Sequence, residues 1–151
     1  MEFTDHRPDM DIEEEIELLI RSFAPLKTSR GHFTFKSAGG HVTVEGNVRS
    51  PQARRVLIDN IPHIRGVVSC DSSKLLDDET VRLAVGVLLP PGVLASVHYG
   101  TVALTGDLPE GASAETIIQA VSAVPGVRRV GAQFGSGTVE APSPQKIEPK
   151  P

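Results

Sequence analysis

The sequence is poor in the residues that build aromatic cores, disulfides and metal centres. Of its 151 residues only 4% are aromatic, none is tryptophan, and Cys70 is the one cysteine. A lone cysteine excludes an internal disulfide and any metal site made from several cysteines. With so few aromatic rings, the cores must be aliphatic, and surfaces on which nucleic-acid bases could stack are scarce.

Long apolar runs are missing as well. No stretch approaches the roughly 20 apolar residues that a membrane-spanning helix needs. The first ten residues are polar and acidic, without the basic and apolar segments of a secretory signal. We therefore expect a cytoplasmic protein, or a periplasmic one if the chain is a mature fragment. The net charge of −4 also argues against a nucleic-acid binder, because such proteins need a basic surface.

What the sequence does contain is one pattern that occurs twice. GHVTVEGNV begins at Gly40, and GTVALTGDL begins at Gly100. Three glycines recur at a constant offset of 60 residues: Gly40, Gly46 and Gly66 return as Gly100, Gly106 and Gly126. A repeat of this length indicates duplicated modules. A module of this size buries only about 60% of the surface of its unfolded chain, so we expect the copies to pack on each other or on a partner.

The chain therefore divides into two modules, residues 11–76 and 77–135, each predicted to fold in the order α-β-β-α-β. The predicted class is α/β (α+β), with a small three-stranded sheet and two helices on one of its faces. Alternating apolar residues predict a hairpin of two strands in each module, and Ser50 and Ser113 are expected to cap the second helices. Residues 1–10 are expected to form a flexible arm, and the Pro-rich residues 136–151 a disordered tail.

The first helix of each module shows an apolar stripe at helical spacing. In the first module the helix follows Asp11 and is expected to end at Pro25, and residues 71–76 are expected to connect the copies. In the second module the predicted buried stripe is Val81, Ala84, Val85 and Leu88. Glutamates at positions 13, 14, 15 and 17 admit two interpretations, a cation site or a solvated helix face. The solvated face is favoured, because adjacent residues fan around a helix.

The outer faces of the two predicted hairpins differ in charge. In the first module this face carries Thr34, Lys36, Thr43 and Glu45, which suit water. In the second it carries Leu94, Ser96, His98, Ala103 and Thr105, with hardly a charge. An uncharged sheet face more often contacts protein than solvent. We expect the second face to pack on the other module or on a second copy of the chain.

Four arginines of the first module form a candidate site for anionic lipid headgroups: Arg49, Arg54, Arg55 and Arg65. Residues 11–76 hold nine Lys and Arg against eight Asp and Glu, whereas residues 77–135 hold three against six. Any anionic surface should therefore prefer the first module. The simpler alternative is solvated surface charge, because so small a cluster attracts anionic lipid only weakly.

No catalytic or metal-binding constellation is recognisable. The histidines, His6, His32, His41, His63 and His98, include no pair at the close helical spacing of a metal motif. Cys70 is most simply a small buried hydrophobe, and no G-x-S-x-G elbow holds a serine nucleophile. We expect neither an enzyme nor a cofactor.

The order of elements and two short motifs resemble the BON domain. The motif G-x-V-x-L-x-G stands at Gly40–Gly46, with Val44 in place of leucine, and at Gly100–Gly106. The motif G-V-x-x-V stands at Gly66–Cys70, with cysteine last, and at Gly126–Val130. The resemblance covers about residues 11–135 and is closer in the second copy. It implies a non-enzymatic binding module, often in tandem, often linked to bacterial envelopes, with members that associate with phospholipid.

The same resemblance implies an alternative function. One relative joins a BON domain to a LysM module and binds potassium, so this chain, which has no LysM segment, is alternatively a sensor of a monovalent cation. Backbone carbonyl ligands would leave no side-chain signature, and the sequence leaves this open. An RNA-binding module is disfavoured by the acidity and by the lack of a basic G-x-x-G loop.

Overall fold

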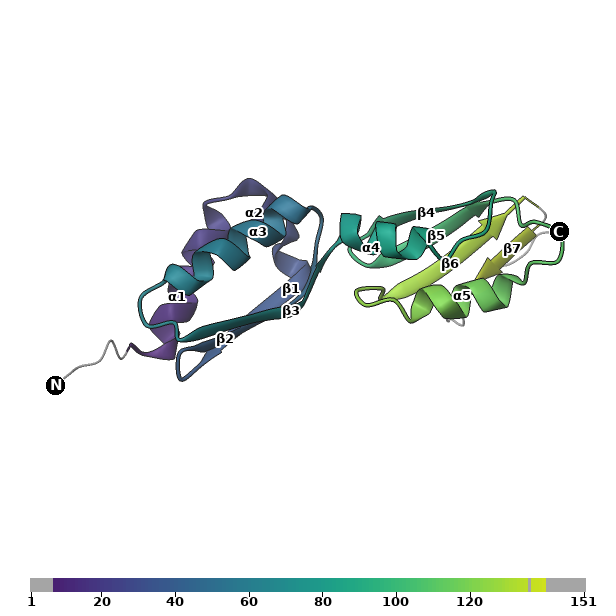
Figure 1. The fold of residues 1–151 in the computed structure, drawn as a ribbon. Helices are drawn as coiled ribbons and strands as arrows, with labels where there is room; N and C mark the ends of the chain where they lie inside the picture. Colours follow the sequence, from purple (N-terminus) through teal and green to yellow (C-terminus); the bar gives the residue numbers. More distant parts are fainter. Residues whose placement is uncertain (1–6, 136, 141–151) are drawn as a thin grey trace. The chain divides into compact units, whose positions relative to one another are not determined.

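The computed structural model describes residues 7–135 and 137–140, with side chains described up to residue 135. It divides into two compact units, Met1–Thr80 and Val81–Pro151, and each is described by itself. Each unit holds one sheet and its own helices (Figure 1). This confirms the predicted class of two similar α/β modules.

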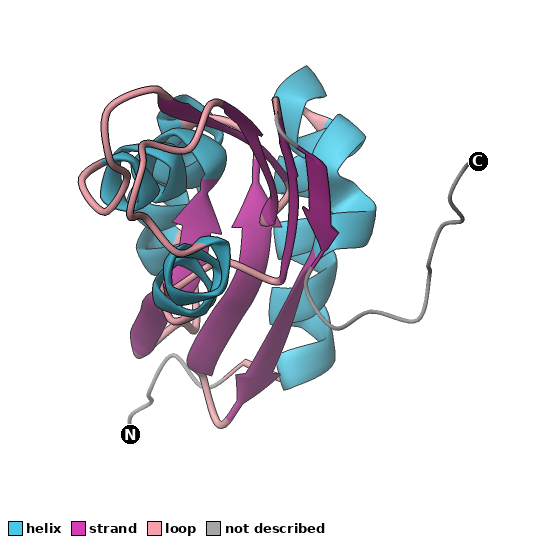
Figure 2. Cartoon of the chain, turned by 90° about the vertical axis from the view of Figure 1, so that its right-hand side faces the viewer, coloured by secondary structure: helices cyan, strands magenta, loops and turns pink. Residues whose placement is uncertain are grey.

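The first unit follows the order expected from the sequence, with one additional helix. Its elements are α1 (Asp9–Arg21), α2 (Ala24–Ser29), β1 (Phe33–Ala38), β2 (His41–Val48), α3 (Pro51–Asn60) and β3 (Ser69–Asp77), with short 3-10 turns at Arg30–His32 and Ile61–His63. The strands lie in the order β1-β2-β3, where β2 is antiparallel to β1 and parallel to β3. The helices lie along one side of the sheet (Figure 1), and the aliphatic core includes Ile16, Val44 and Leu57. Figure 2 shows the helices and strands of both units in separate colours.

The second unit repeats this plan with a shorter first helix and one more strand. Its elements are α4 (Asp78–Gly86), β4 (Val93–His98), β5 (Thr101–Gly106), α5 (Ala114–Ser122), β6 (Arg129–Phe134) and β7 (Gly137–Glu140). The strands lie in the order β4-β5-β6-β7, and β7 runs antiparallel to β6. Ser50 and Ser113 cap α3 and α5 as predicted, each accepting the amide N–H three residues on.

The 60-residue offset of the sequence reappears in the strand register. Phe33 lies opposite Gly46 in the first hairpin, and Val93 lies opposite Gly106 in the second. Both glycines have a positive φ, 129° and 103°. A Cβ at Gly46 would lie 2.5 Å from the Phe33 Cα, and one at Gly106 would strike the Gly92 carbonyl oxygen. The repeated glycine is therefore required by the close approach of two backbones.

Two predicted boundaries in the first unit are wrong. The arm predicted for residues 1–10 ends early, because α1 begins at Asp9; residues 1–6 lie outside the described part. Pro25 does not end the first helix. That helix stops at Arg21, and Pro25 occupies the first turn of the added helix α2, where its missing N–H leaves no hydrogen bond unmade.

Residues 71–76, predicted to connect the modules, instead belong to strand β3. A β-bulge beside Thr43 interrupts the pairing of β3 with β2, and the Asp71 carboxylate fixes it by accepting the amide and hydroxyl of Ser73 at 3.0 and 2.7 Å. No loop follows the strand. Asp77 ends β3, and its carboxylate accepts the Thr80 amide at 2.8 Å, so that it also caps α4.

The disordered tail predicted for residues 136–151 is wrong over residues 137–140, which form strand β7. Residues 137–140 pair with β6, from Phe134 opposite Gly137 to Gly131 opposite Glu140. The second sheet is therefore four-stranded, where three strands were expected. Residue 136 and residues 141–151 lie outside the described part of the chain.

The apolar stripe predicted for α4 is only half buried. Val81 and Val85 have exposed fractions of 1% and 0%. Ala84 is exposed, and Leu88 keeps 43% of its surface exposed. The helix ends at Gly86, so Leu88 lies beyond it and does not continue the buried side.

Candidate functional site

The outer face of the second sheet brings together all five residues predicted for a protein contact. Leu94 lies opposite Thr105, and Ser96 lies opposite Ala103. These residues and His98 are exposed to solvent. We define the outer face as the residues that point away from the helices: Leu94, Ser96 and His98 on β4, Thr101, Ala103 and Thr105 on β5, and Arg129, Gly131 and Gln133 on β6. Arg129, at one end, is its one charged member within the described side chains.

The same positions in the first sheet are charged. The exposed residues there are Thr34 and Lys36 on β1, Thr43 and Glu45 on β2, and Asp71 and Lys74 on β3. Thr34 precedes Leu94 by the 60-residue offset, and Lys36 precedes Ser96. The same fold thus presents a face suited to water in one unit and, in the other, a face whose described side chains carry the single charge of Arg129. Leu94, with 67% of its surface exposed, is the largest apolar side chain on that face.

Two of the four arginines predicted to bind anions are engaged within the protein. Arg49 forms an ion pair with Asp78, with 2.7 Å between Nη1 and Oδ2. Arg54 Nε donates to the Leu75 carbonyl oxygen at 2.5 Å, and its Nη2 donates to the Ser72 carbonyl oxygen at 3.4 Å. Both guanidinium groups are therefore directed at β3 and at the start of α4.

The other two arginines lie elsewhere. Arg55 borders a shallow groove of about 550 Å³ between α2 and α3, whose apolar wall includes Phe23 and Val56. Arg65 is exposed in the loop before β3, and its carbonyl oxygen accepts a hydrogen bond from Arg7. Because Arg54 is directed at β3 and Arg55 borders the groove beside α2, the structure does not gather the four side chains into one cluster.

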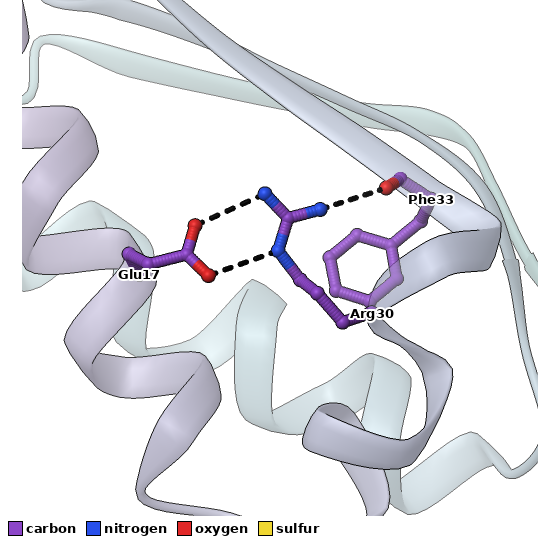
Figure 3. A network of polar contacts seen from close by, with 3 residues as sticks. All are labelled: Glu17, Arg30 and Phe33. Atoms are coloured by element: carbon purple, nitrogen blue, oxygen red, sulfur yellow. Dashed lines mark hydrogen bonds and ion pairs between the residues drawn. The ribbon is translucent and has the colours of Figure 1, made fainter.

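Side chains close the free edge of β1 in the first sheet. The Ser37 amide donates to Glu13 Oε2 at 2.9 Å, and Arg30 Nη1 donates to the Phe33 carbonyl oxygen at 3.4 Å. Arg30 is held by Glu17 through two hydrogen bonds of 3.0 Å (Figure 3). This pairing lowers the pKa of Glu17 and raises that of Arg30. Capped edge groups are poor templates for pairing with another strand.

These contacts correct the expectation of a solvated glutamate face on α1. Glu13 and Glu17 bind β1 and Arg30, and Glu15 pairs with Arg7 at 2.6 Å. Of the four glutamates, Glu14 alone has an exposed side chain. Three of these carboxylates fix the helix to the rest of the first unit, and spacing along one helix gave no sign of their partners.

Asp9 is a structural residue that the sequence did not reveal. Its carboxylate accepts the Ser37 hydroxyl at 2.6 Å and the Gly39 and Gly40 amides at 2.8 and 3.0 Å. These bonds, led by that of Ser37, lower the pKa of Asp9. The hairpin turn is therefore held by the first turn of α1. In the second unit Tyr99 takes the place of Gly39, also with a positive φ, 49°.

The histidines and the cysteine have surface and packing roles. His41 and Ser69, on neighbouring strands, lie 2.7 Å apart between Nδ1 and Oγ, and His98 stacks edge-on against Tyr99. Cys70 is half-buried against the core, and burial raises the pKa of its thiol. Within the described residues, no three His, Cys, Asp or Glu side chains gather as a metal site would require.

The helices in the described part of the chain are all too short or too polar to cross a membrane.

Comparisons with known proteins agree with this architecture. Residues 82–134 match the family model of the BON domain, and they lie in the second unit, whose motifs are the more complete. No curated protein sequence matches the chain.

Two solved structures resemble the fold. One is described as CdsD, a structural protein of the type III secretion system of Chlamydia trachomatis. It has a TM-score of 0.67 and 19% identity over 83% of this chain and 61% of that chain. The other is the C-terminal domain of CdsD, with a TM-score of 0.62 and 19% identity over 82% and 64% of the two chains. This chain thus spans less than two thirds of either, and at such identity the likeness is one of fold.

Proposed function

We propose that this chain is a non-enzymatic structural protein that assembles through protein contacts at the outer face of its second sheet. The observation that carries this is the contrast between two matched surfaces. The first sheet presents Lys36, Glu45, Asp71 and Lys74 to solvent, whereas the equivalent surface of the second presents Leu94, Ser96 and Ala103. An exposed and uncharged sheet face is typical of a contact surface.

The comparisons support a role in binding or scaffolding. The BON match lies on the unit that carries the uncharged face. The similarity to CdsD extends over 83% of this chain, so it includes residues of both units. That protein is described as a structural protein. The register shared by the two units supports the further proposal that the first is a BON-like module as well, so that the chain is a tandem pair.

Measuring self-association tests whether the outer face of the second sheet, and not any exposed sheet position, mediates protein contacts. We expect Leu94→Asp to lower the weight-average mass measured by sedimentation equilibrium, because a buried carboxylate without a partner is costly. Thr34→Asp, at the matched position of the first unit, should leave association unchanged. Both residues are exposed, so unfolding in urea should change by no more than about 0.5 kcal/mol. Equal association of wild type and Leu94→Asp would reject the proposal.

The phospholipid and potassium alternatives enter as outcomes of a second experiment. Amide chemical shifts of the full chain are followed by NMR as its concentration rises, as anionic phospholipid vesicles are added, and as potassium replaces sodium. Concentration-dependent shifts on the outer face are expected. Shifts confined to Arg49, Arg54, Arg55 and Arg65 with vesicles, or a compact cluster of amides that responds to potassium alone, would favour the alternatives.

The compartment is part of the proposal. The sequence predicts the cytoplasm, with the periplasm as its alternative, whereas a role like that of the CdsD neighbour would place the chain in an assembly of the bacterial envelope. Cell fractionation of the untagged protein decides between these locations.

A further inference from the structure

We propose that the groove between α2 and α3 binds the C-terminal segment, residues 141–151, of another copy of this chain. Lys146, Ile147 and Glu148 make the contact. The inference rests on the proposed function only in placing the contact between copies, because the groove is a surface of the first unit and is separate from the outer face of the second sheet.

The groove has an apolar floor and two opposite charges on one rim. It holds about 550 Å³, a volume within the usual range of ligand sites. Phe23 and Val56 are half-buried against the core of the first unit and belong to the floor. Arg55 and Asp59 line the groove from α3, and both are exposed. Neither is in an ion pair with another described residue, so both charges are open to a partner.

Helical spacing brings the groove residues of α3 to one side of the helix. Gln52 is followed by Arg55 and Val56 and then by Asp59, intervals of three and four residues that share a helix face. Leu57 lies on the other side and is buried in the core. An apolar side chain that lies over Val56 therefore has one positive and one negative group beside it along the helix axis.

The C-terminal segment, which lies outside the described part of the chain, carries the complementary pattern. Its one large apolar residue, Ile147, stands between Lys146 and Glu148. Pro144 and Pro149 flank these three residues. Prolines favour the extended polyproline II backbone, which reduces the conformational entropy lost on binding. The segment thus offers one apolar anchor with a charge of each sign beside it.

The charges match in spacing as well as in sign. Four residues of α-helix rise by about 6 Å, which separates Arg55 from Asp59 along α3. Two residues of polyproline II also rise by about 6 Å, which separates Lys146 from Glu148. With Ile147 on the apolar floor and the segment antiparallel to α3, Lys146 lies at Asp59 and Glu148 at Arg55. The parallel direction sets like charges together, so the pattern also fixes the direction of the segment.

The exposed sheet faces fit this pattern less well. Among the described side chains of the second sheet's outer face, Arg129 is the one charge, so Lys146 would find no partner there. The outer face of the first sheet offers both signs, for example Lys36 and Glu45, but its described exposed residues include no large apolar side chain for Ile147. The groove combines the apolar floor with both charges.

A peptide titration tests the contact. The receptor is the full chain carrying Ile147→Asp, which disables its own segment, and the probe is a synthetic peptide of residues 141–151. In NMR spectra of the receptor, the amides of Arg55, Val56 and Asp59 should shift and reach saturation as peptide is added. The matched control is Arg65→Glu in the receptor, an exposed arginine outside the groove, which should leave the affinity unchanged.

An exchange of charges tests the pairing itself. Arg55→Glu in the receptor should weaken binding of the peptide roughly fivefold, because a repulsion replaces an attraction between exposed charges. A peptide with Glu148→Arg should bind the Arg55 receptor more weakly by a similar factor and should regain its affinity on the Arg55→Glu receptor. In the full chain with Ile147 intact, Arg55→Glu should lower the weight-average mass in sedimentation equilibrium, and adding Glu148→Arg should restore it.

Several outcomes would overturn the inference. It fails if the peptide causes no saturable shift at the groove, or if Arg55→Glu weakens both peptides equally. Unchanged association of the full-chain Arg55→Glu variant would reject a contact between copies. Leu94→Asp in the receptor should leave peptide binding intact, and a loss of binding would place the segment on the outer face and leave the proposed function standing. Intact peptide binding, together with equal association of Leu94→Asp and wild type, would reject the proposed function alone. Circular dichroism checks that the variants fold.

Discussion

The guanidinium of Arg54 lies along the outer edge of β3, with its Nε 2.5 Å from the Leu75 carbonyl oxygen. In the second unit the same edge of the third strand pairs with β7. In the first unit the Arg54 side chain thus occupies hydrogen-bonding groups on the edge of β3, and in the second unit strand β7 occupies those of β6. Together with the bulge of β3, it blocks the kind of strand pairing that exposed edges invite.

Arg54→Ala is therefore expected to destabilise the first unit. Losing a hydrogen bond from a charged donor should lower the free energy of unfolding by about 1.5 kcal/mol, the low end of the range for charged groups, because the site is only partly buried. Arg55→Ala, at the exposed neighbouring position, should change it by no more than about 0.5 kcal/mol. Urea unfolding of both variants measures the difference, and equal effects would argue that the Arg54 contacts contribute nothing.

Asp9 should make the stability of the first unit depend on acidity. Its pKa in the folded chain lies below the ordinary value of 3.8, because the folded state stabilises the carboxylate. Its contribution is therefore complete above that ordinary value and is lost as the pH falls through the lowered pKa. Asp9→Asn should be less stable than wild type at pH 7, and the gap should narrow below about pH 4.

The matched control for this experiment is Asp11→Asn, on the same helix with an exposed side chain. It should follow wild type across the whole pH range in urea unfolding. If the gap between wild type and Asp9→Asn stayed constant from neutral to acid pH, the carboxylate would not be what holds the hairpin turn.

The repeated glycines should tolerate no side chain. Gly106→Ala places a Cβ against the Gly92 carbonyl oxygen at a positive φ, so we expect a loss of roughly 2 kcal/mol or more in unfolding free energy. Gly46→Ala should cost a similar amount. Gly131→Ala is the control, because nothing lies within 4 Å of its added Cβ. Thermal melts followed by circular dichroism compare the three, and a neutral Gly106→Ala would contradict the close backbone approach.

Cys70 should react slowly with thiol reagents. Burial first, and then the Asp71 carboxylate, raise the pKa of the thiol, and the thiolate is the reactive form. Reaction with a disulfide reagent at pH 8 should be slower than for a free thiol and should accelerate in urea. Asp71→Asn should be modestly faster than wild type in the native state. A rate equal to that of free cysteine would mean that the side chain is open to solvent.

The hairpins could be predicted from the sequence because their determinants are local. Gly46 and Gly106 mark the close approach of two strands, and alternation of apolar residues such as Val42 and Val44 fixes which face is buried. The five residues predicted for the outer face, Leu94 among them, follow from the same alternation. Alternation with a period of two involves only neighbouring residues, so it can be recognised without knowledge of any long-range contact.

The errors in the predicted fold arose where long-range contacts determine the local structure. β3 runs through the polar residues 71–74, which show no apolar alternation, because β2 pairs with them and Arg54 bonds their outer edge. β7 is too short to show a period. The clamp of Asp9 on Gly39 joins residues 30 positions apart, and a single sequence carries no trace of it. The stripe predicted for α4 was wrong at Leu88 because the helix ends earlier, at Gly86.

The strand-to-helix junction at Asp77 has a practical consequence for dissecting the protein. The division between compact units falls between Thr80 and Val81, inside a helix whose cap is the last residue of the preceding strand. Cutting the chain at that division would remove Asp77 and the first turn of α4 from the downstream fragment. The upstream fragment would end in an incomplete helix. Separate halves should therefore be cloned with overlapping ends, each keeping Asp77 through Gly86, and proteases should find few cleavable bonds between them.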